Sequence, residues 1–393
     1  MGLSPSTHTN RETPSGHASE AAAGAAAAAP PILRATLQLY RLFDLADALD
    51  VARARACLTT APVSQRAVIS RGGSIEISQL PLAVELTSTT VPLREAAGPA
   101  RLDARLYDLG IVALRLNVPL AGPLSWGAAA DLMAGVQPPP SWLLGLFREW
   151  LDGLQASIAP ALQRPNATVR EEDYTHFVVE RLGEGVPASH LARHPALLQA
   201  ALGERKPLSA AAAALATPLS YYDDDLILLT WNSALIIDPD ADAREDAALL
   251  LEFANVQLLA FRTYDARVDA ELAALAPRVA RMRPFLWPVA LSSRRFLSEV
   301  HSLIADITDT SARVENALKV TEDVYWNRVY TAALNVLRVE VFRTGVSDGL
   351  RVLREMASLL HDEAEATWTS LLEVLVVVLI FVEIVLALIG QHH

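Results

Sequence analysis

Three aspartates, Asp238, Asp240 and Asp242, have the spacing with which an EF-hand calcium loop begins. The sixth position of such a loop requires glycine and the twelfth requires a bidentate glutamate. Here these positions are Ala243 and Leu249. We therefore interpret the three aspartates as a loop that caps a helix, and not as a calcium site.

Two other clusters contain residue types that bind metals. His190 and His194 lie four residues apart, as in the zinc-protease pattern HExxH, but Leu191 stands where that pattern requires glutamate. Residues 221–225, two tyrosines and three aspartates, directly precede an apolar run and are interpreted as a solvated turn. The sequence also lacks the dinucleotide-binding glycine pattern, the P-loop, GxSxG and CxxC. We expect no metal, no cofactor and no catalytic residue.

The densest mixture of polar side chains lies on one long predicted helix, at Glu252, Asn255, Arg262, Asp265 and Asp269. Arg262 and Asp265 are three residues apart and can form a local ion pair, and Glu252 and Asn255 can share a helix face. We interpret the group as a polar interface between helices. The alternative is a membrane-bound enzyme whose pocket lies between the preceding domain and this helix, using Glu252, Arg262 or Asp265.

Two residues elsewhere complete the candidate interface. Trp326 begins an apolar face that continues at Tyr330 in a later helix. Glu383 lies near the middle of an apolar terminal run, where an acidic side chain costs about 2.5 to 3.5 kcal/mol in a membrane. Protonation or pairing with a second copy would lower that cost.

Residues 35–240 mix predicted strands and helices. Alternating apolar and polar residues predict a strand at LQLYRLF, followed by a helix at DLADALDVARARACL. SIEIS, LAVEL, LDARLY, IVALRLNV, THFVVERL, DLILLTW and SALII are further predicted strands. Ser125 and Ser141 can cap two helices, and HPALLQAAL predicts another. This order predicts an α+β fold with a mostly antiparallel sheet.

Residues 241–370 predict long helices. Asp242 can cap the first, which should end before Pro284. A second helix from Ser292 has apolar residues at spacings of three and four, a coiled-coil-like seam. Its apolar positions are Phe296, Val300, Leu303, Ile307, Val314 and Leu318. A third has Trp326, Tyr330, Ala333, Leu337 and Val341 on one face, and a turn between Gly345 and Gly349 should lead to the last helix.

The apolar run LLEVLVVVLIFVEIVLALI, residues 371–389, predicts a C-terminal transmembrane helix. At 1.5 Å per residue its nineteen residues would extend about 28 Å, close to the hydrocarbon thickness of a bilayer. Four residues follow it, so we expect a tail-anchored protein whose body faces the cytoplasm. The predicted domains are a disordered tail (1–34), an α+β domain (35–240), a helical, coiled-coil-like domain (241–370) and the membrane anchor (371–389).

The composition restricts the kinds of molecule that the chain is expected to bind. A net charge of −12 repels a polyphosphate at long range, which disfavours direct binding of nucleic acid. The single cysteine, Cys57, excludes an internal disulfide framework and is interpreted as a packing residue.

Three segments together resemble the family named for a requirement in meiotic nuclear division, a domain of unknown function. They are LLEFANVQLLAFRTYDARVD, EDVYWNRVYTAAL and LLEVLVVVLIFVEI. The resemblance implies an inner-membrane protein, mitochondrial in eukaryotes, that forms homo-oligomers and supports translation by tethering ribosomes. It implies no catalytic residues. For this chain it implies the cytoplasmic membrane of a bacterium, with the mitochondrial inner membrane as the alternative.

These observations together predict a non-enzymatic scaffold held at a membrane. Its helices would associate with other copies of the chain, and its α+β domain would bind a protein or ribosome-associated partner.

Overall fold

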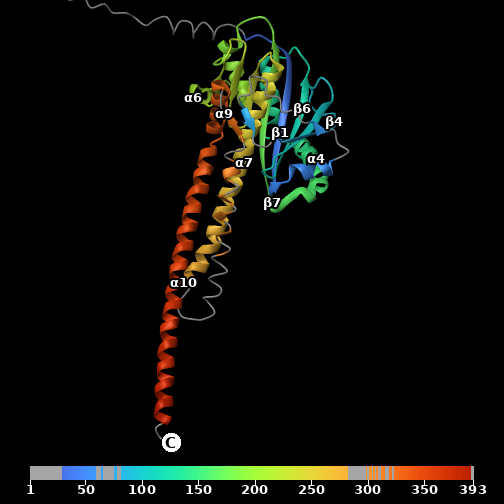
Figure 1. Cartoon of the computed structure of the whole chain (residues 1–393). Helices are drawn as coiled ribbons and strands as arrows, with labels where there is room; N and C mark the ends of the chain where they lie inside the picture. Colours follow the sequence, from blue (N-terminus) through green and yellow to red (C-terminus); the bar gives the residue numbers. More distant parts are fainter. Residues whose placement is uncertain are drawn as a thin grey trace, which may run out of the picture.

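The computed structural model describes residues 29–58, 63–64, 75–77, 81–281 and 323–390, with short pieces between 298 and 320. The chain has an α+β fold with an N-terminal mixed sheet and several helices, as predicted. Within the described residues a large sheet forms a head, from which two long helices project (Figure 1). The predicted disordered tail, 1–34, lies outside the described residues up to residue 28.

The large sheet has nine strands in the order β2-β4-β5-β6-β1-β7-β10-β9-β8. Neighbours pair antiparallel except β7 and β10, which are parallel. The strands are β1 (Ile32–Leu49), β2 (Val63–Ser64), β4 (Leu82–Thr89), β5 (Ala100–Leu106), β6 (Ile111–Leu120), β7 (Leu162–Leu182), β8 (Thr217–Leu219), β9 (Leu226–Leu229) and β10 (Ser233–Ile237). A separate pair joins β3 (Ile75–Ile77) to β11 (Leu318–Val320).

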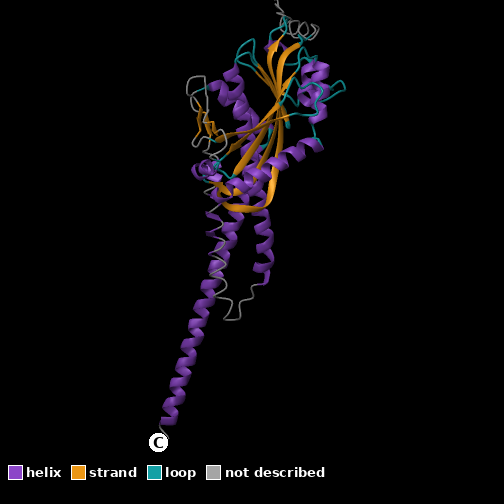
Figure 2. Ribbon diagram, turned by 90° about the vertical axis from the view of Figure 1, so that its right-hand side faces the viewer, coloured by secondary structure: helices purple, strands orange, loops and turns teal. Residues whose placement is uncertain are grey.

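Helices cover both faces of this sheet (Figure 2). One apolar core includes side chains of the helices α2 (Val51–Cys57), α3 (Trp126–Val136), α4 (Ser141–Ile158) and α5 (Pro195–Leu202). The short helix α6 (Ala210–Ala213) lies near β8 in the sequence. The opposite core includes side chains of α7 (Ala241–Arg281), α9 (Val324–Val336) and α10 (Val339–Gly390). The architecture is therefore helix, sheet, helix.

The first strand is longer than its sequence pattern predicts. β1 runs without interruption through DLADAL, which we had predicted to be helical, and the helix that follows has only seven residues. Nearly every side chain from Leu42 to Leu49 is buried, because both faces of the strand are covered by helices. Burial on both faces removes the alternation that identifies a strand.

The helix α7 is the centre of the second core. Every side chain from Asp246 to Phe261 is buried, because the sheet lies on one side and α9 and α10 on the other. Its start is fixed by Asp240, whose carboxylate accepts a hydrogen bond from the amide of Asp242 at 3.0 Å. The predicted helix is confirmed and runs to Arg281, but it begins at Ala241, so Asp240 and not Asp242 is its capping residue.

The predicted second helix lies largely outside the described residues, including Phe296, Val300 and Leu303. Ile307 and Val314 are described and are buried in the same core as α7. They therefore pack inside the chain, whereas the predicted seam would leave them free to contact a second copy.

The last helix, α10, is continuous for 52 residues. The predicted turn between Gly345 and Gly349 does not form, and both glycines instead lie where α10 crosses α7. A Cβ atom on Gly345 would overlap Asp265 Oδ1, and one on Gly349 would overlap Val268 Cγ1. Helix α9 is separated from α10 at Arg338, which has a φ of 54°. The two glycines therefore allow the helix backbones to approach closely.

The predicted transmembrane anchor, residues 371–389, lies in the far half of α10. Among the residues that the structure describes, no helix is long and apolar enough to cross a membrane. The prediction of a transmembrane helix is not supported by this finding.

Both edges of the large sheet are short. The edge strand β2 has two residues, and β8 has three with Pro218 at its centre. Proline has no amide hydrogen to donate, and short edges offer few unpaired backbone groups to another chain.

The close crossing of α7 and α10 predicts the effect of substituting Gly349. The variant Gly349→Val should unfold at lower denaturant, with a loss of about 1 to 3 kcal/mol in the free energy of unfolding, because the added side chain overlaps Val268. The control is Gly153→Ala in the exposed part of α4, where a Cβ has no neighbour within 4 Å and stability should hold or rise. Equal stabilities of Gly349→Val and the wild type would contradict the close packing.

Candidate functional site

Charged side chains alternate along β5 and β6 on the face of the sheet that α7 covers. Arg101, Asp103 and Arg105 occupy every second position of β5, so they point to the same face. The antiparallel register places Asp103 opposite Arg115 and Arg101 opposite Asn117 on β6. Five polar side chains therefore meet on one patch of an otherwise apolar sheet.

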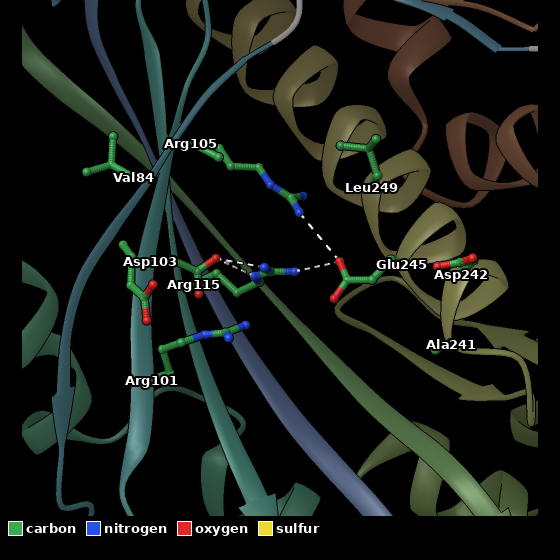
Figure 3. A pocket seen from close by; sticks show the side chains of 11 residues that line it. Val84, Arg101, Asp103, Arg105, Arg115, Ala241, Asp242, Glu245 and Leu249 are labelled. Carbon is green, nitrogen blue, oxygen red and sulfur yellow. Dashed lines mark hydrogen bonds and ion pairs between the residues drawn. The ribbon is translucent and has the colours of Figure 1, made fainter. Parts of the chain in front are cut away.

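The helix α7 presents a complementary row to this patch. Glu245, Leu249 and Glu252 are spaced by four and three residues, which places them on one side of a helix. Figure 3 shows Glu245 extending from the helix toward Arg105 and Arg115, which extend from the strands. The sheet and the helix are therefore joined here by charged groups.

The deepest part of the interface is an ion pair between Arg105 and Glu252. Arg105 Nη1 donates to Glu252 Oε2 at 2.5 Å, and Tyr107 Oη donates to Glu252 Oε1 at 2.6 Å. The Glu252 side chain is 0% exposed. Burial raises the pKa of Tyr107, and the charge of Glu252 raises it further. This tyrosine therefore remains a neutral hydrogen-bond donor.

A second pair joins Arg115 to Asp103. Arg115 Nε donates to Asp103 Oδ2 at 2.8 Å, and Asn117 Nδ2 donates to Asp103 Oδ1 at 2.5 Å. Glu245 is held more loosely, with Oε2 at 3.2 Å from Arg115 Nη1 and 3.6 Å from Arg105 Nη2. Burial acts to raise the pKa of Glu245, but the charges of Arg115 and Arg105 outweigh it and lower the pKa.

A buried histidine lies beside these pairs. Gln38 Oε1 accepts a hydrogen bond from Tyr40 Oη at 3.1 Å and lies 3.2 Å from His176 Nδ1. Because an amide oxygen only accepts, His176 carries its proton on Nδ1. Its Nε2 has no hydrogen-bond partner among the described residues. Burial lowers the pKa of His176 to about 3, and the charges of Arg115 and Arg105 act in the same direction.

Two cavities open beside these groups at the start of α7. The first, about 370 Å³, lies between α7 and the strands β4 to β6. The second, about 350 Å³, lies between the start of α7 and the strands β1, β6 and β7. Arg101, Ala241 and Glu245 line both cavities. The two cavities adjoin at these three residues, and together we call them the cleft.

The candidate residues predicted on α7 do not all lie in this cleft. Glu252 is in the buried pair described above. Asn255 is buried and donates to the carbonyl of Leu251 at 2.8 Å, within the helix. Arg262 pairs with Glu172 of β7 and not with Asp265. Asp265 lies against Gly345 of α10.

The two other predicted residues lie farther away. Trp326 is buried in the core that α9 forms with α7, and Glu383 is exposed near the end of α10. Asp225 of the acidic cluster accepts hydrogen bonds from the amides of Tyr221 and Tyr222, and thus forms a turn. No group of three or more potential metal ligands converges in the described part of the chain.

Sequence analysis missed the residues that form the cleft: Arg101, Asp103, Arg105, Arg115 and Glu245. The available signal was a charge at every second position from Arg101 to Arg105, of which Asp103 and Arg105 lie in the predicted strand LDARLY. A solvated sheet face gives the same pattern, so the signal becomes specific only when a helix is known to cover that face.

The family model described as "Uncharacterized protein MJ0711, N-terminal domain" matches residues 34–243. This is more than half of the sequence and includes the large sheet except the first two residues of β1. The chain belongs to this family. The match ends at the first residues of α7, so the family includes the β5 and β6 side of the cleft.

Among curated proteins the chain is similar to "Uncharacterized protein MJ0711" of Methanocaldococcus jannaschii. The two are 23% identical over 174 residues, which is 44% of this chain and 52% of the relative. The chain thus spans about half the length of this relative. No solved structure matches the chain.

These comparisons overturn the resemblance to the family named for meiotic nuclear division. The matching family is a different one, with an archaeal relative, and nothing in the comparisons points to the meiotic family. The quoted segments lay on long helices and an apolar run, which many helical proteins share. The implied roles in mitochondria and in ribosome tethering are withdrawn with it.

The buried pair predicts how the protein responds to loss of one charge. Glu252→Gln should lower the free energy of unfolding by about 3 to 5 kcal/mol, because it leaves Arg105 without its buried partner. The double variant Arg105→Met, Glu252→Leu should recover much of this loss, since no charge is then buried alone. Denaturant unfolding of the three proteins measures both effects. A single variant as stable as the wild type would contradict the pair.

The neutral buried histidine predicts a pH dependence. His176 binds a proton in the unfolded chain below about pH 6.5 but not in the folded chain until about pH 3. Stability should therefore fall as the pH decreases through this window. Between pH 7.5 and 5 the wild type should lose about 2 kcal/mol more than His176→Gln. Parallel pH profiles of the two proteins would rule out a buried neutral histidine.

Proposed function

We propose that this chain is a non-enzymatic scaffold that attaches its α+β head to a membrane through the far end of α10. The observation that carries the proposal is the exposure of apolar side chains there. Between Leu372 and Ile384, eleven large apolar residues are 46% to 67% exposed. Covering them would contribute roughly 1 kcal/mol each, on the order of 10 kcal/mol together.

The distribution of these side chains favours lipid over a single partner helix. Residues 374–382 are nine consecutive apolar residues. Successive residues on a helix are 100° apart, so this run is apolar in every direction. A coiled-coil partner needs only one apolar seam and leaves polar residues on the outer faces. An environment that is apolar on all sides is the hydrocarbon of a bilayer.

The arrangement of the helices suits a tether. Helix α10 leaves the head beside α7 and continues beyond the end of α7 (Figure 1). The 34 residues from Val339 to Leu372 would extend about 50 Å at 1.5 Å per residue. The head would then meet its partner about 50 Å from the membrane.

Association of several copies fits the same proposal. Glu383 lies next to the apolar run, and a lone carboxylate in hydrocarbon is costly. Contact between copies within the membrane would let these carboxyl groups share protons or hydrogen bonds. The alternative of an enzyme using Glu252, Arg262 or Asp265 has less support, because none of the three lines either cavity of the cleft.

Liposome flotation tests the attachment. The full-length wild type should rise with phosphatidylcholine vesicles, and the double variant Val377→Asp, Ile380→Asp should remain at the bottom of the gradient. The control is Val341→Asp, which adds one aspartate at an exposed position of α10 near the head and should still float.

The mass of the wild type without lipid or detergent completes this test. A discrete oligomer that does not bind vesicles would show that other copies cover the apolar end, and would contradict membrane attachment.

A further inference from the structure

The cleft at the start of α7 has donors that its own acids do not use. Arg105 and Arg115 are only 12% and 7% exposed, and Glu252 and Asp103 fix them in place. A guanidinium has five N–H donors. Arg105 makes one close hydrogen bond, through Nη1 to Glu252, which leaves donors on the cleft side. The two arginines are thus preorganised with spare donors.

Arg101 adds a third guanidinium to the cleft. It lines both cavities and, among the described residues, has no carboxylate within ion-pair distance. Figure 3 shows Arg101, Arg105 and Arg115 extending from the strands toward the side that α7 covers. Pairing Arg105 with Glu252 and Arg115 with Asp103 leaves the charge of Arg101, and the other acids that line the first cavity are Glu245, Glu85 and Asp242.

Glu245 is the loosely held acid of this group. Its side chain is 50% exposed, and its contacts of 3.2 and 3.6 Å are longer than the 2.5 to 2.8 Å of the buried pairs. Ion pairs that are this exposed contribute about 0 to 1 kcal/mol. The carboxylate can therefore leave the two arginines at little cost.

We propose that the cleft binds a small molecule with a carboxylate or phosphate group, and that this group replaces the Glu245 carboxylate on Arg105 and Arg115. Arg101 contacts the same group from the mouth of the cleft. The start of α7, at Ala241, adds the positive end of a helix dipole. Glu245 thus acts as an internal substitute for the ligand.

The other residues that line the first cavity restrict the charge, polarity and size of the rest of the ligand. Ala83 and Leu249 provide an apolar surface in the first cavity. Glu85 and Asp242 line the same cavity and are exposed, which disfavours a second anionic group. A volume of about 370 Å³ suits a small metabolite. The ligand class is therefore a compact acid whose far end is apolar, neutral or cationic.

Calorimetric titration of the full-length protein in detergent tests this site. The probes are inorganic phosphate and acetate, titrated separately at constant ionic strength, so that the preferred anion is identified. Glu245→Gln should bind the preferred probe about two- to fivefold more tightly than the wild type, because the weakly held competing carboxylate is gone. Arg101→Gln should bind it at least tenfold more weakly.

The control is Glu340→Gln, which removes an acid from the exposed pair that Glu340 forms with Arg343 on α10. Its affinity should equal that of the wild type. Affinities that are the same in all four proteins would mean that the probe binds elsewhere, and would overturn the proposal. Absence of binding in both the wild type and Glu245→Gln would also overturn it. This result would leave the membrane proposal untouched.

Discussion

The structure depends on one helix that is buried on every side. From Asp246 to Phe261, α7 lies between the sheet and the two last helices, so it has no face turned to water. A helix in this position must satisfy each polar side chain that it carries. Glu252 does so through Arg105 and Tyr107. The sheet must therefore supply charged partners at matching positions, and β5 and β6 do so.

The sequence was sufficient to predict an element correctly where its local signals agree with the tertiary packing. The hairpin of β5 and β6 at Gly110, the cap of α3 at Ser125 and the extent of α7 follow from turn, capping and periodicity rules. The sequence did not predict the second half of β1 as a strand, because burial on both faces removes the alternation of apolar and polar residues there. It also could not reveal the cleft, because Glu245 is 140 residues from Arg105 in the sequence and meets the arginines of β5 only when α7 docks on the sheet.

The incorrect family resemblance has a similar physical explanation. It rested on the helices and the apolar run, whose patterns reflect general requirements of helix packing. The family match lies instead in residues 34–243, which form nearly all of the large sheet. Patterns that many helical proteins need carry little information about ancestry.

The shortness of the two edge strands limits how copies of this chain can combine. An open sheet with long edges can extend through neighbouring molecules without end, as fibrils do. Here β2 and β8 offer two and three residues, and Pro218 removes one of the few donors. Another copy that paired with β2 or β8 would therefore gain only a few backbone hydrogen bonds, which disfavours growth of the sheet into a fibre through these strands.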